Sequence, residues 1–97
     1  MQRREYNIRI KFNSKQIVKV IVDPHFELKH AESITDEIIL ALVKMLNGLS
    51  MISETVTPPY SYFMEDMMEL NGKFYKLIWV IEDDQMYIGV VNAYRRK

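Results

Sequence analysis

Residues 63–94 read FMEDMMELNGKFYKLIWVIEDDQMYIGVVNAY, and this stretch decides the fold. It contains three runs rich in aromatic and β-branched residues, which favour strands, separated by Asn71-Gly72 and Asp83-Asp84. Asn-Gly is a strong hairpin signal because both residues tolerate positive φ. The stretch therefore predicts an antiparallel β-meander. Its expected strands cover 63–70, 73–82 and 85–94.

The pairing within this meander follows from the assumed turns. A two-residue turn at Asp83-Asp84 would place Val80 opposite Tyr87 and Ile78 opposite Gly89. Both faces of the resulting sheet are apolar, and one helix cannot cover both. The uncovered face is therefore expected to meet the N-terminal hairpin, the segment 49–60 or another protein.

The first part of the chain predicts a β-hairpin. Apolar residues alternate with polar ones from Tyr6 to Phe12, the period of a half-buried strand. Asn13-Ser14 supplies turn chemistry, and residues 16–22 are rich in Val and Ile.

One main helix is expected over residues 36–47. Thr35 can cap it, its apolar residues recur at helical spacing, and Gly48 suits the left-handed position after a helix. Residues 49–60 contain Thr57-Pro58-Pro59 and predict a surface loop. The expected fold is thus α+β, a single domain over 1–97 in which an N-terminal β-hairpin accompanies one main helix packed on an antiparallel β-meander sheet.

Composition narrows the function classes. The 97 residues include no cysteine, which excludes thiolate zinc sites and disulfides, and no apolar run approaches the ~20 residues that span a bilayer. A cytoplasmic protein without membrane partners is expected. The net charge is zero, yet residues 1–30 hold seven basic and three acidic groups, 31–72 one and seven, and 73–97 five and three. This gradient is compatible with a local basic site and equally with chance clustering.

Two segments carry candidate chemistry. Residues 25–30 (HFELKH) hold both histidines, and a histidine exchanges protons near neutral pH. Residues 92–97 (NAYRRK) combine a phenol with three cations, which suits phosphate binding and base stacking. The alternatives are a solvated strand edge and a basic solvated tail. A metal site is not expected, because His25, Glu27 and His30 have no evident fourth ligand.

Methionines gather in residues 64–68 (MEDMM), where they serve as core or as an adaptable contact surface. Met67 and Met68 must point to opposite faces of a strand, so one of them is a candidate for a partner interface. The residues assigned to this interface are Met67, Met68 and Trp79.

The Lys29-His30 pair before the helix, the meander from Gly72 to Asp84 and the closing Tyr94-Arg95-Arg96 resemble the RelE/ParE-like toxins of bacterial toxin–antitoxin systems. More broadly they are similar to the barnase–EndoU–colicin–RelE group of small ribonucleases. The likeness covers residues 25–97.

This resemblance implies a metal-independent endoribonuclease in which a ribose 2′-hydroxyl attacks the adjacent phosphate. The catalytic residues would be His30 as general acid or base, Lys29 and Arg95 as stabilisers of phosphoryl charge, and Tyr94 as a stacking or hydrogen-bonding group. RNA would also contact Arg96 and Lys97.

The implied partners are RNA, free or on the ribosome, and a cognate antitoxin protein, with no cofactor. The competing hypothesis is a non-catalytic interaction module, either a toxin relative that binds a protein target or a dimerising accessory protein, possible as a homodimer.

Overall fold

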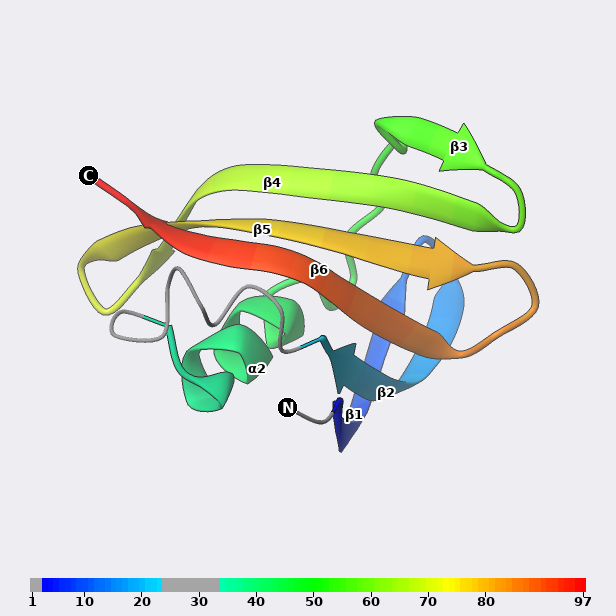
Figure 1. The fold of residues 1–97 in the computed structure, drawn as a ribbon, viewed down its shortest axis with the longest axis horizontal. Helices are drawn as coiled ribbons and strands as arrows, with labels where there is room; N and C mark the ends of the chain where they lie inside the picture. Colours follow the sequence, from blue (N-terminus) through cyan, green and yellow to red (C-terminus); the bar gives the residue numbers. More distant parts are fainter. Residues whose placement is uncertain (1–2, 24–33) are drawn as a thin grey trace.

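The computed structural model describes residues 3–23 and 34–97. About 60% of the structure is strand, and all six strands belong to one sheet (Figure 1). Within the described ranges a single short helix lies against one face of it. The elements in chain order are β1 (Arg4–Phe12), β2 (Lys15–Val22), α2 (Asp36–Lys44), β3 (Thr55–Thr57), β4 (Tyr60–Leu70), β5 (Lys73–Glu82) and β6 (Tyr87–Arg96).

Two of the predicted turns are confirmed. Asn13 and Ser14 have φ of 52° and 62°, and Phe12 pairs with Lys15 across them. Asn71 and Gly72 have φ of 54° and 80°. Positive φ at both central residues matches the right-handed twist of the flanking strands, so each turn closes a tight hairpin.

The sheet order is β1-β2-β6-β5-β4-β3. All neighbours are antiparallel except β2 and β6, which run parallel from Lys19 opposite Tyr87 to Val22 opposite Val90. The expected architecture, one main helix on an antiparallel meander, is therefore wrong. The N-terminal hairpin extends the same sheet and makes it mixed, because β6 uses its second edge to bind β2.

An aromatic cluster shows that this sheet is curled. The ring of Phe12 in β1 lies 5.2 Å from Phe63 in β4 and 5.7 Å from Trp79 in β5, edge-on to both, and Phe63 stacks on Trp79 at 5.7 Å. Three strands separate β1 from β4 in the sheet order. The two strands meet only because the sheet curls around the core, which also takes in the buried side of α2.

The helix begins as expected and ends earlier. The Thr35 side chain accepts a hydrogen bond from the backbone N–H of Ile38 at 3.2 Å, the N-cap arrangement. Asp36 at the first turn accepts two hydrogen bonds from the Arg4 guanidinium, at 2.5 and 2.7 Å, and one from the Tyr6 hydroxyl. These bonds tie the start of α2 to β1. The helix stops at Lys44 and a turn continues to Gly48.

The register of β5 and β6 differs from the prediction. Val80 pairs with Gly89, and Ile78 with Asn92, because the connection spans residues 83–86 and a bulge in β6 adds Val91. The segment 49–60 was expected to be a surface loop, but it contains β3, which pairs with the start of β4. Thr55, Val56 and Thr57 are β-branched, which favours a strand.

No helix in the described ranges, 3–23 and 34–97, has the length and apolarity needed to cross a membrane.

Candidate functional site

The C-terminal end of β6 carries a small basic cluster around a phenol. Tyr94 pairs with Lys76 of β5 and is half-buried on the sheet face that points away from α2. The Lys76 ammonium lies 5.8 Å and the Arg96 guanidinium carbon 5.9 Å from the centre of the Tyr94 ring. Both distances allow a cation–π interaction, so the ring and the two cations form one unit.

Arg96 also forms an ion pair. Its Nε lies 3.1 Å from Oδ1 of Asp66, in the bulge of β4 where Met67 has φ of 56°. Both side chains keep partial exposure, 43% and 35%. A phosphate that binds Arg96 must therefore compete with Asp66 in a solvated setting, where such pairs are weak.

The structure separates Arg95 from this cluster. Arg95 pairs with Tyr75, whose side chain is buried in the core, so it extends from the opposite face of the sheet to Tyr94. Lys97 follows the strand and is exposed. Lys76, in contrast, was not predicted as a site residue, because the strand pairing assumed from the sequence did not place it beside Tyr94.

The other half of the predicted active site, Lys29 and His30, lies outside the described residues. The same holds for His25 and Glu27. What the structure does show is the strand that leads to them. Val22 pairs with Val90, and β6 continues from there towards Tyr94 in the direction in which β2 ends.

Two of the three residues assigned to a partner interface are buried. Trp79 is 0% and Met68 6% exposed, and both belong to the core. Neither side chain offers a surface to another protein. Met67, which is 52% exposed, remains available. The opposite orientation of Met67 and Met68 agrees with the expectation from the sequence.

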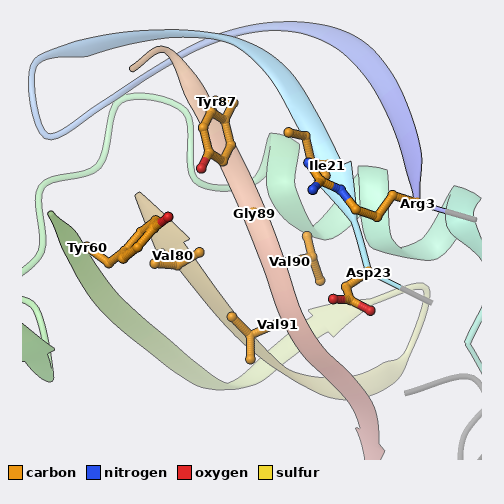
Figure 2. A pocket seen from close by; sticks show the side chains of 9 residues that line it. All are labelled: Arg3, Ile21, Asp23, Tyr60, Val80, Tyr87, Gly89, Val90 and Val91. Carbon is orange, nitrogen blue, oxygen red and sulfur yellow. The ribbon is translucent and has the colours of Figure 1, made fainter. Parts of the chain in front are cut away.

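A hollow of about 300 Å³ opens on the same sheet face as Tyr94, over β6 and β5 (Figure 2). Two tyrosines, a glycine and a pair of opposite charges contribute to it. Its lining residues are Arg3, Ile21, Asp23, Tyr60, Val80, Tyr87, Gly89, Val90 and Val91. Because they come from the N-terminal stretch and strands β2, β4, β5 and β6, no single motif in the sequence announces the hollow.

Tyr87 is held in place within this hollow. Its hydroxyl donates a hydrogen bond of 2.7 Å to Oε1 of Glu82. Burial, together with this bond and the negative charge of Glu82, raises the pKa of Tyr87 to about 12. The phenol is therefore protonated at neutral pH and acts as a hydrogen-bond donor.

Asn92 adds a polar atom between the hollow and Tyr94. Its Oδ1 is buried and has no hydrogen-bond partner among the residues that the structure describes. An unpaired buried acceptor costs about 1–3 kcal/mol of stability.

Within residues 3–23 and 34–97 no three His, Asp or Glu side chains are grouped so that they could hold a metal ion.

Comparison with known protein families, with curated proteins and with solved structures finds no match for the chain.

Proposed function

We propose that the protein is a toxin-like, metal-independent endoribonuclease that binds RNA on the sheet face carrying Tyr94, Arg96 and Lys76. The observation that carries the proposal is the parallel pairing of β2 with β6. Parallel neighbours end at the same edge of a sheet, so the chain that leads to Lys29 and His30 leaves β2 beside the strand that ends in Tyr94 and Arg96.

The chain length is compatible with one site. Tyr94 lies four residues beyond Val90, about 13 Å along the strand at ~3.3 Å per residue. His30 follows Asp23 by seven residues, which can span at most about 25 Å. The covalent connection thus allows His30 to reach the cluster.

The chemistry assigns a role to each group. His30 takes the proton of a ribose 2′-hydroxyl, the 2′-oxygen bonds to the adjacent phosphorus, the bond from phosphorus to the 5′-oxygen breaks, and that oxygen takes up a proton. The products are a 2′,3′-cyclic phosphate and a 5′-hydroxyl. Lys29, Arg96 and Lys76 stabilise the phosphoryl charge, and Tyr94 positions the ribose or stacks on a base.

The test measures cleavage of a single-stranded RNA by the purified protein in the presence of EDTA. Wild type is expected to yield cyclic-phosphate ends, and His30→Ala is expected to lose at least 100-fold in rate, the usual contribution of a general acid or base (~10²–10⁴). Arg96→Ala and Lys76→Ala should lower the rate less. Lys11→Ala, which removes an exposed cation on β1, is the matched control. Folding of each variant is checked by circular dichroism.

Removing the ion pair between Arg96 and Asp66 should give a variant that binds RNA more tightly. Asp66→Asn releases Arg96 from its carboxylate and removes a negative charge beside the phosphate path. RNA affinity should rise by a factor between about 1.4 and 5, the range set by a surface pair of ~0.2–1 kcal/mol. If neither Asp66→Asn nor Arg96→Ala changes the RNA affinity, the RNA binds elsewhere on the protein.

Exposed apolar side chains favour a second candidate, the non-catalytic interaction module. Leu49, Ile52 and Val56 are 45%, 94% and 59% exposed within the segment that joins α2 to β4. If wild type neither binds nor cleaves RNA, this candidate replaces the first. Sedimentation of wild type and Ile52→Ser then tests whether that segment joins two copies of the chain.

A further inference from the structure

Gly89 and Val80 pack closely together at the floor of the hollow on the outer face of the sheet. A Cβ built on Gly89 would lie 2.9 Å from Cγ1 of Val80, closer than side chains normally approach. Gly89 faces Val80 directly across the β5–β6 pair. Cγ1 of Val80 therefore occupies the position where a side chain of residue 89 would stand, and the two residues together form the floor of the hollow.

Two phenol rings border this floor. Tyr60 enters from β4 and Tyr87 from β6, and Figure 2 shows the Tyr60 ring next to Val80 and the Tyr87 ring further along β6 from Gly89. The bond from Tyr87 to Glu82 fixes one ring, so little side-chain freedom is lost when a ligand binds against it. Rigid aromatic rings beside an apolar floor suit a flat ligand.

The opposite rim is polar. Arg3 and Asp23 line it, and Figure 2 shows the Arg3 side chain reaching across Ile21 towards Tyr87. A guanidinium donates hydrogen bonds and a carboxylate accepts them. The hollow thus combines aromatic faces with both a donor and an acceptor, which matches a heterocycle that has polar atoms on its edge.

We infer that this hollow binds a nucleobase of single-stranded RNA, with the ring against Tyr60 and Tyr87 and its polar edge towards Asp23 and Arg3. The inference rests on the proposed function and extends it, because it names a base-binding subsite beside the phosphate site. A volume of about 300 Å³ is at the lower end of ligand pockets, the size for one ring system and its sugar.

The distance between the two places fits a continuous RNA strand. Gly89 and Tyr94 lie on the same strand, five residues apart, or about 17 Å at ~3.3 Å per residue. Asn92 lies between them on the same strand. Single-stranded RNA is commonly bound in this way, through bases stacked on aromatic side chains of a sheet and a basic track for the backbone.

The experiment titrates four ribonucleoside 5′-monophosphates into the isotope-labelled protein and follows the Gly89 amide and the Val80 methyl groups by NMR. Saturable shifts at these positions are expected. Tyr60→Leu should weaken binding about tenfold, the loss expected for one stacking contact. Tyr62→Leu is the matched control, because Tyr62 is half-buried on the same strand and lies outside the hollow. Ribose 5-phosphate serves as the probe without a base.

The outcomes separate the two proposals. Nucleotide binding that depends on Tyr60, in a protein that does not cleave RNA, supports the base subsite and refutes the nuclease. RNA cleavage with no nucleotide-induced shift at Gly89 supports the nuclease and overturns the base subsite. Equal binding of ribose 5-phosphate and the nucleotides also overturns it, since phosphate alone would then occupy the hollow. Gly89→Ala gives a second check, because its methyl group would displace Val80 Cγ1 at the floor of the hollow and should weaken nucleotide binding.

Discussion

The contact between Phe12 and Phe63 gives the sharpest test of the curled sheet. We predict that a double-mutant cycle with Phe12→Leu and Phe63→Leu yields a coupling free energy of about 0.5–1.5 kcal/mol, the value typical of an aromatic pair. Leucine keeps both positions apolar, so each single change should cost only about 1–2 kcal/mol in the free energy of unfolding.

The magnitude follows from the geometry. The two ring centres are 5.2 Å apart and the ring planes meet at 87°, an edge-to-face contact. In a flat sheet of the same order, β1 and β4 would be four steps apart, or about 19 Å at ~4.8 Å per step. Residues more than ~7–10 Å apart usually show coupling no larger than ~0.3–0.5 kcal/mol. The cycle thus separates a curled sheet from a flat one.

The assay is equilibrium unfolding in urea, followed by the fluorescence of Trp79, the one tryptophan in the chain. Trp79 is fully buried and contacts both rings, so its emission reports on the core. A domain of this size has about 5–15 kcal/mol of stability, and the double variant should stay folded. A cycle between Phe63 and Phe74 is the control, because Phe74 lies on the outer face and is 38% exposed. Destabilising single changes with no coupling between Phe12 and Phe63 would refute the curled arrangement.

Three further changes test other parts of the structure. The hydrogen bonds from Arg4 hold the pKa of Asp36 below its usual 3.8. The stabilisation that they give is therefore complete above pH 3.8 and disappears as pH falls through the lower pKa of the folded state. In urea unfolding between about pH 5 and 2, Asp36→Asn should lose less stability on acidification than wild type does. The pKa of Tyr87 is raised to about 12 in the folded protein, so the stabilisation linked to its protonated phenol is complete below the unfolded-state value of 10 and is lost as pH rises through 12. Ultraviolet titration of Tyr87→Phe should show one late-ionising phenol fewer than wild type, because the pKa of Tyr6 is raised as well. Gly72→Ala should cost about 1–2 kcal/mol of unfolding free energy, all of it from the φ of +80°, because an added Cβ meets no atom within 4 Å; thermal unfolding that matches wild type would contradict the turn geometry.

Local features of the fold were predictable from the sequence. The alternation from Tyr6 to Phe12, the Asn71-Gly72 turn and the Thr35 cap each depend on neighbours a few residues away, and all three are confirmed. The parallel pairing of β2 with β6 could not be predicted, because it joins residues about 70 positions apart and leaves no periodic signal.

The register errors have a similar cause. A bulge changes the pairing of every residue that follows it, and the one at Val91 depends on what packs on each side of β6. The wrong register hid the contact between Lys76 and Tyr94. The basic end of β6 was visible as a motif, whereas the hollow above Gly89 required the three-dimensional arrangement of separate segments.

The place of β6 in the sheet has a consequence for synthesis on the ribosome. Of the six strands it is the last to be translated, yet it lies between β2 and β5 and provides the only link in the sheet order between the N-terminal hairpin and the group β3–β5. Until it emerges, the nascent chain holds two separate sheet fragments with the core side of each open to water. The two fragments can join only after β6 has left the ribosome, so the complete sheet should form late, in a step dominated by contacts between distant residues.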